Sequence, residues 1–273
     1  LVFPTKYYNK TDAGFIWVNS SKEAAMRIII SPAKHDAGGP RTLCRPGGLD
    51  PVSAGEPGGL LTALRNLSPA ELQKLWKCSD KIAEENFLKL KELDLYSNVT
   101  PAVLSYEGIQ YQYMAPQVFS AEQWDYVREH LRILSGLYGV LRPMDGVIPY
   151  RLEMQAKLKM GSTQDLYAFW GDRIYRELAE GEDFLLNLAS IEYSRAAEKY
   201  IDRKTRFVTC VFGELSDGKV KVKGTMAKMA RGEMVRWLSE KNITEPDEMK
   251  EFTGLGYGFD AARSTDKELV FLK

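Results

Sequence analysis

Two short, largely apolar runs constrain the fold of this chain most. One covers residues 27–30, where Arg27 is followed by three isoleucines, and the other covers residues 184–189. A serine follows each run at once, Ser31 in the first case and Ser190 in the second. Apolar runs of this length, bounded by turn-forming residues, predict strands buried in a core.

Further strands and helices alternate irregularly around these two runs. Residues 206–212 and 219–223 predict a hairpin, and residues 268–272 predict a final strand. Residues 35–59 are rich in Gly and Pro without periodicity, which is typical of a loop or a disordered segment. Apolar stripes at helical spacing predict helices over 68–91 with one short break, from 120 to about 135, over 165–180 and over 226–240. The pattern favours an α+β fold, a mixed α/β single domain.

The start of the chain has a different character. Residues 1–25 are polar and aromatic and have no apolar core of signal-peptide type, whereas Met26 begins the first strand. We expect residues 1–25 to be an extension and residues 26–273 to form one domain.

A helix, a short turn and a second helix are predicted within residues 68–91. Ser68, Pro69 and Glu71 make a strong helix start, with an N-cap, a proline in the first turn and a capping-box glutamate. Ser79 can cap the second helix. One interpretation is a helix–hairpin–helix element, in which backbone amides and Ser79, Lys77 and Lys81 bind DNA phosphate. The alternative is an ordinary helical hairpin packed on the core.

Composition excludes several classes of protein. Lys+Arg and Asp+Glu are both 37, so any anion-binding site must be a local patch. The three cysteines are scattered and only two histidines occur, so we expect no metal and no cofactor. Unpaired cysteines and the lack of an apolar run of 18 residues favour a cytoplasmic protein without a membrane span. The oligomeric state is not predicted.

Polar side chains gather where predicted elements end, which is where function is usually presented. Residues 195–236 also carry eleven Lys/Arg and five Asp/Glu, a local excess of positive charge that suits a phosphate partner. The candidates for phosphate binding are Lys34, Lys77, Ser79, Lys81, Arg142, Arg151, Lys228, Arg231 and Arg236. The candidates for a polar cleft are Ser31, Tyr150, Glu153, Asn187, Ser190, Glu192, Tyr193 and Arg195. The alternatives are a solvated helix and hairpin face, and a buried ion-pair network of Arg142, Arg151 and Glu153.

Several motifs resemble one known family. They are Ile30-Ser31-Pro32-Ala33-Lys34, Ser79-Asp80-Lys81, the run 134–143 followed by 149–154, Phe169-Trp170-Gly171, Asn187-Leu188-Ala189-Ser190 with Glu192-Tyr193, and Ala230-Arg231-Gly232. In this order they are similar to the motifs of the YaaA family of peroxide stress proteins. The resemblance spans Met26 to the end of the chain, except for residues 35–59.

The resemblance implies a compact mixed α/β fold with a helix–hairpin–helix element and a positively charged cleft. It further implies DNA binding and a role in limiting iron-dependent damage during hydrogen peroxide stress. It supplies no established reaction, so an enzyme is the less favoured expectation.

Three hypotheses follow. In the first, the cations bind DNA through its backbone with little sequence preference. In the second, the polar cleft is an active site for a nucleotide or nucleic acid, with Glu192 or Glu153 as acid/base and Lys34 stabilising developing charge. In the third, the motifs serve packing and ion pairing alone.

Overall fold

A mixed α/β sheet forms the centre of the molecule. The computed structural model describes residues 26–33, 35–36, 55–95 and 99–273. Five strands run parallel, in the spatial order β5 (Leu131–Ser135), β1 (Met26–Ile30), β8 (Phe184–Leu188), β9 (Arg206–Ser216) and β12 (Glu268–Leu272). Antiparallel strands complete it: β6 (Gly139–Leu141) beside β5, β11 (Gly258–Phe259) beside β12, and β10 (Lys219–Lys221) beside the far end of β9.

The order of the parallel strands marks one place, at the carboxyl ends of β1 and β8, that we call the crevice. The chain enters at β1, places β5 on one side of it, and then places β8, β9 and β12 on the other side. Where the connections from two neighbouring parallel strands run to opposite sides of the sheet, a gap opens at the carboxyl ends of those strands. Ligands of α/β proteins commonly bind in this gap. In this chain the change falls between β1 and β8.

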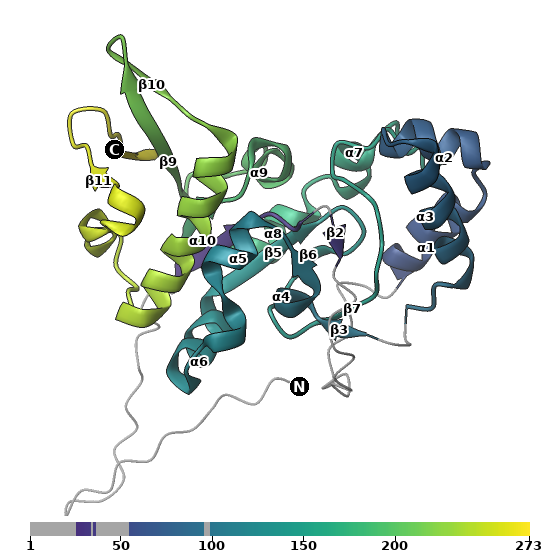
Figure 1. The fold of residues 1–273 in the computed structure, drawn as a ribbon, viewed down its shortest axis with the longest axis horizontal. Helices are drawn as coiled ribbons and strands as arrows, with labels where there is room; N and C mark the ends of the chain where they lie inside the picture. The colour runs from purple at the N-terminus through teal and green to yellow at the C-terminus, as the bar shows by residue number, and fades with distance from the viewer. Residues whose placement is uncertain (1–25, 34, 37–54, 96–98) are drawn as a thin grey trace, which may run out of the picture.

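Helices pack on the sheet through closely fitted contacts. The helices α5 (Ile109–Met114), α6 (Ala121–His130) and α10 (Gly224–Lys241) pack together, and Figure 1 shows α5 and α10 in front of β1. The helix α8 (Arg173–Ala179) packs on β6, β8 and α9 (Ile191–Glu198). The shorter elements are β2 (His35–Asp36), β3 (Thr100–Pro101), α4 (Ala102–Ser105), β4 (Tyr106–Glu107), η1 (Pro116–Val118), β7 (Gly146–Val147), α7 (Leu166–Trp170), η2 (Glu248–Glu251) and η3 (Gly254–Gly256).

Three helices lie together at one end of the molecule (Figure 1): α1 (Gly55–Arg65), α2 (Pro69–Trp76) and α3 (Asp80–Glu92). The predicted capping box at Ser68 is confirmed, since its side chain accepts from Glu71 N and the Glu71 carboxylate accepts from Ser68 N. Lys77 ends α2 in the left-handed conformation, with φ 46°. Ser79 precedes α3 with cap geometry but makes no side-chain capping bond. We call residues 69–92 the α2–α3 hairpin.

Three predictions about elements were wrong or incomplete. Residues 131–135 are the strand β5, not the end of a helix. A short buried run of this kind is compatible with either element, and its pairing with β1 makes it a strand. The predicted loop at 35–59 contains β2 and the start of α1, since Leu60, Leu61 and Leu64 bury one side of that helix despite its glycines. The predicted helix at 165–180 is two helices, broken at Gly171 with φ 53°. The expected extension at residues 1–25 lies outside the described residues.

Candidate functional site

Two serines meet in the crevice between β1 and β8. The Ser31 hydroxyl accepts from the backbone N–H of Ser190 at 2.8 Å and lies 3.2 Å from the Ser190 hydroxyl. Because parallel neighbours end at the same edge of the sheet, two residues 159 positions apart become direct partners. Ser31 and Ser190, the polar residues that follow the two strands predicted from sequence, therefore lie side by side in the fold.

Neighbouring side chains hold this crevice in shape. From α5, Tyr111 donates to the Ser31 carbonyl at 3.0 Å and Gln110 donates to the Leu188 carbonyl at 3.3 Å. Asn187 is buried, accepts from Ala189 N at 2.9 Å, and donates to the Thr209 hydroxyl at 3.1 Å. Both the oxygen and the nitrogen of the Asn187 side-chain amide thus hold the end of β8 in place.

Buried phenols form a second polar layer beside the serines. The Tyr150 hydroxyl lies 2.9 Å from the Tyr106 hydroxyl and 2.7 Å from the Ser135 hydroxyl. Burial, followed by the nearby tyrosines, raises the pKa of Tyr106 well above its ordinary value. Burial also raises the pKa of Tyr111. The Tyr106 and Tyr111 hydroxyls therefore stay protonated at neutral pH and act as neutral hydrogen-bonding groups.

Two carboxylates and a guanidinium border the crevice. Tyr150, Arg151, Glu153 and Tyr193 line a small pocket together with Pro32 and Ala33. Arg151 and Glu153 form an ion pair at 3.5 Å, and both side chains are largely buried, at 12% and 13% exposure. Burial is the main cause of the raised pKa of Tyr193, and the charges of Glu192 and Glu153 add to it. The sequence-predicted polar residues around this pocket are thus brought together.

Glu192 faces the same region from the first turn of α9. Its Oε1 accepts from Gln155 N at 3.4 Å, and its backbone carbonyl accepts from the Tyr167 hydroxyl at 2.7 Å. Arg195, one turn further along α9, is exposed and lies over the Tyr167 ring. We use the term crevice for Ser31, Ser190 and the pocket beside them.

Of the four arginines predicted to bind phosphate, Arg151 lies at the crevice and the other three do not. Arg142 follows the antiparallel edge strand β6 and so lies beside the start of β5, at the opposite end of the strands from the crevice. Its neighbours there are Asp145 and Arg132. Arg231 is largely enclosed, and burial lowers its pKa. Arg236 pairs with Glu240 on α10 at 2.8 Å.

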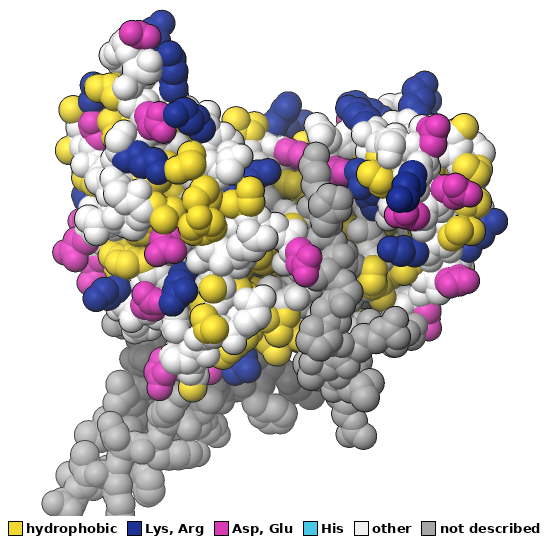
Figure 2. Space-filling view, viewed as in Figure 1, with side chains coloured by type: hydrophobic (Ala, Val, Ile, Leu, Met, Phe, Trp, Pro, Cys, Tyr) yellow, Lys and Arg dark blue, Asp and Glu magenta, His cyan; other side chains and the backbone are white. Residues whose placement is uncertain are grey.

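The predicted lysines are more accessible. Lys77, Lys81 and Lys228 are exposed, and none has an ion-pair partner within the part of the chain that the structure describes. Lys34 lies outside the described residues. Figure 2 shows this face hollowed between two shoulders, with Lys and Arg side chains over α2 and α3 on one side and over the β9–β10 arm on the other.

The family assignment rests on comparison with known proteins. The family described as peroxide stress protein YaaA matches residues 26–263. This chain belongs to the YaaA family. A UPF0246 protein of Lachnoclostridium phytofermentans is 50% identical over 248 residues, which cover 91% of this chain and 96% of the relative. A UPF0246 protein of Agathobacter rectalis is 50% identical over 246 residues, covering 90% and 98%. One from Pediococcus pentosaceus is 45% identical over 253 residues, covering 91% and 98%.

In this YaaA-family chain, sequence reasoning named Lys77 but missed the three lysines that line a groove with it, Lys74, Lys157 and Lys159. Lys74, Lys77, Lys157 and Lys159 line a groove of about 590 Å³ between α2 and residues 151–159, and Arg151 forms part of its wall. Lys157 pairs with Asp165 at 3.1 Å. The sequence did carry a signal for Lys157 and Lys159, which alternate with the buried Ala156 and Leu158. Such alternation indicates an extended segment with one solvent-exposed side.

The described residues contain neither a candidate metal site nor a helix that could span a membrane. No group of three or more His, Cys, Asp or Glu side chains there could hold a metal ion. None of the described helices of this YaaA-family chain is long and apolar enough to cross a membrane.

Proposed function

We propose that this chain binds DNA through backbone phosphates as part of the response to peroxide stress. The family name supports the peroxide-stress role. The observation that carries DNA binding is a set of exposed lysines on the α2–α3 hairpin, Lys74, Lys77 and Lys81, which have no ion-pair partner among the described residues. Lysine neutralises phosphate without reading sequence, so binding is expected to depend weakly on sequence and strongly on salt.

The start of α3 supports the same use of the hairpin. Ser79 makes no side-chain cap, so its hydroxyl does not occupy the first-turn amides. Uncapped amides at a helix start favour an anion, and Lys77 and Lys81 flank that start. A phosphate here would meet the first-turn amides and the ammonium groups of Lys77 and Lys81, beside the Asp80 carboxylate, which accepts from Gln73.

A salt titration tests the proposal. Fluorescence anisotropy with a labelled duplex is measured for the native chain and for Lys77→Ala/Lys81→Ala between about 50 and 200 mM salt. The double variant is expected to bind more weakly and to reduce the slope of log K against log salt by about 2, roughly one for each phosphate that a lysine no longer neutralises. The control is Arg142→Ala, at the opposite edge of the sheet, which should leave the slope unchanged. Absence of DNA binding by the native chain at low salt would refute the proposal.

A second candidate function is an enzyme acting on a nucleotide or nucleic acid in the crevice. Its support is the position of Ser31, Ser190, Glu153 and Tyr193 at the point where the strand order changes direction. Glu153 or Glu192 would then serve as the acid/base. Chromatography of nucleotides and oligonucleotides after incubation should show a product that Glu192→Gln or Glu153→Gln abolishes while DNA binding remains. A product formed equally by both variants would exclude this role for the carboxylates.

A further inference from the structure

The groove between α2 and residues 151–159 has an apolar floor. Its volume of about 590 Å³ lies within the range of about 300–1,000 Å³ that binding pockets usually have. Apolar side chains from both walls form the floor: Ala63, Leu67, Leu75, Ala156 and Leu158. The first three are partly exposed and so are available for contact.

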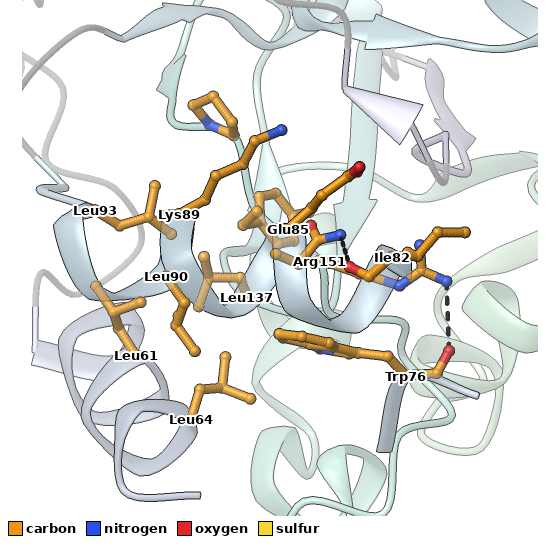
Figure 3. Close-up of a pocket in the computed structure, with 13 residues that line it drawn as sticks. Leu61, Leu64, Trp76, Ile82, Glu85, Lys89, Leu90, Leu93, Leu137 and Arg151 are labelled. Atoms are coloured by element: carbon orange, nitrogen blue, oxygen red, sulfur yellow. Dashed lines mark hydrogen bonds between the residues drawn. The ribbon is translucent and has the colours of Figure 1, made fainter. Parts of the chain in front are cut away.

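A hydrogen bond joins the two walls. Arg151, at the start of one wall, donates to the Trp76 carbonyl at the end of α2, at 3.3 Å (Figure 3). The spacing of the walls is therefore fixed at this point without a ligand. A pre-formed groove loses less conformational freedom when it binds a partner.

Lysines stand on both rims of the groove. Lys74 and Lys77 belong to α2 and its C-cap, and Lys157 and Lys159 belong to the opposite wall, where buried and exposed residues alternate. All four side chains are exposed. Lys157 pairs with Asp165 at 3.1 Å, and the other three have no ion-pair partner among the described residues.

The carboxylates of the lining are already engaged. Glu71 accepts from the backbone N–H and the hydroxyl of Ser68, at 2.8 and 2.7 Å, and Glu153 pairs with Arg151 at 3.5 Å. With Asp165 included, five cationic side chains stand against three carboxylates around the groove, so a net charge of +2 remains. An occupant should therefore be both anionic and partly apolar.

Positive charge on two sides of an apolar floor selects the shape of the occupant. An amphipathic helix presents an apolar stripe with polar side chains on both flanks, so its carboxylates can reach both rims. A β-strand sends alternate side chains to opposite faces, so the neighbours of its buried residues would point away from the groove. A single nucleic-acid strand is usually held by stacking on aromatic rings, and Trp76, the aromatic residue of the described lining, is only 3% exposed.

We propose that this groove binds an acidic amphipathic helix of a partner protein. The apolar stripe of the helix packs on Leu67 and Leu75, and its carboxylates pair with the lysines of the two rims. This site does not depend on DNA binding. Lys74 and Lys77 also belong to the lysines proposed to bind DNA, so the helix and DNA should exclude each other. That consequence alone rests on the proposed function.

Fluorescence anisotropy with a labelled synthetic peptide tests the site. The probe is a helical peptide with leucines at i, i+4 and i+7 and glutamates on both flanks of that stripe. The native chain is expected to bind it saturably at about 0.15 M salt, where distant exposed charges are largely screened. A peptide with serine in place of leucine should bind roughly tenfold more weakly, and one with lysine in place of glutamate should not bind. Equal binding of the leucine and serine peptides, or no binding of the leucine peptide, would overturn the proposal.

Variants locate the bound peptide. Lys157→Ala/Lys159→Ala should weaken peptide binding by roughly threefold to tenfold, within the range for two exposed ion pairs. The matched control is Lys81→Ala on α3, outside the lining, which should leave peptide binding unchanged although it is expected to weaken DNA binding. Leu75→Glu places a carboxylate on the floor and should abolish peptide binding. Leu67→Glu replaces it if circular dichroism shows that Leu75→Glu does not fold.

Three outcomes separate this site from the alternatives. Unchanged affinity of Lys157→Ala/Lys159→Ala for the peptide would place the peptide elsewhere and refute the inference. If labelled oligothymidylate binds through these two lysines and the leucine peptide does not bind, the groove holds a nucleic-acid strand and the inference is wrong. A native chain that binds the peptide but no DNA duplex supports this site and refutes the proposed function alone.

Discussion

The close packing of α5 on α10 leaves no room for a side chain at Gly232. A Cβ at this position would lie 2.0 Å from the Gln110 carbonyl oxygen and 3.0 Å from Met114 N. Both atoms are backbone, so no side-chain rotation relieves the clash. To move from 2.0 Å to an ordinary contact of 3.4 Å, α5 would have to shift by about 1.4 Å.

We expect Gly232→Ala to lower the free energy of unfolding by about 3 kcal/mol, at the upper end of the usual cost of overpacking a core. For a chain of this size the melting temperature should fall by roughly 6–12 °C. The shift would also reach the crevice, because α5 carries Tyr111, which donates to the Ser31 carbonyl, and Gln110, which donates to the Leu188 carbonyl.

Urea unfolding followed by circular dichroism measures the effect. The matched control is Gly224→Ala at the start of the same helix, where an added Cβ meets nothing within 4 Å. Alanine is the better helix former, so this control should be about 0.5 kcal/mol more stable than the native chain. If Gly232→Ala unfolds within about 0.5 kcal/mol of the native chain, the close approach of α5 to α10 is not as described.

Three further predictions concern caps, pH and the phenol layer. Ser68→Ala should destabilise by about 1 kcal/mol in urea unfolding, whereas Ser79→Ala, which removes no capping bond, should cost clearly less. Burial raises the pKa of Tyr126 above its ordinary 10.0 and that of the Cys210 thiol from 9.0 to about 12. The unfolded state therefore releases these protons first, and stability, complete below pH 9, should fall as the pH rises towards 12. Cys210→Ala should reduce this slope by about 1.4 kcal/mol per pH unit, and an unchanged slope would contradict the assignment. Tyr150→Phe removes a hydroxyl shared with two partners and should lower the free energy of unfolding by about 1–2 kcal/mol, which urea titration would show or exclude.

Local signals in the sequence were reliable where one short segment decides its own structure. The capping box at Ser68 and the buried strand at 184–189 were predicted and are present, because capping and burial of a short run depend on neighbouring residues. The strand β5 was missed, since Leu131–Ser135 becomes a strand only by pairing with β1.

The sequence also indicated which residue types would form the candidate site, but not how they meet. Ser31 and Ser190 could be selected because each follows a buried strand, and their contact depends on β1 and β8 being parallel neighbours. Arg142 and Arg151 are near each other in sequence, yet the strands β5 and β6 place Arg142 at the opposite edge of the sheet. Residue type and local capping are properties of the chain itself. Convergence of distant side chains depends on strand order, which arises only when the whole core is buried together.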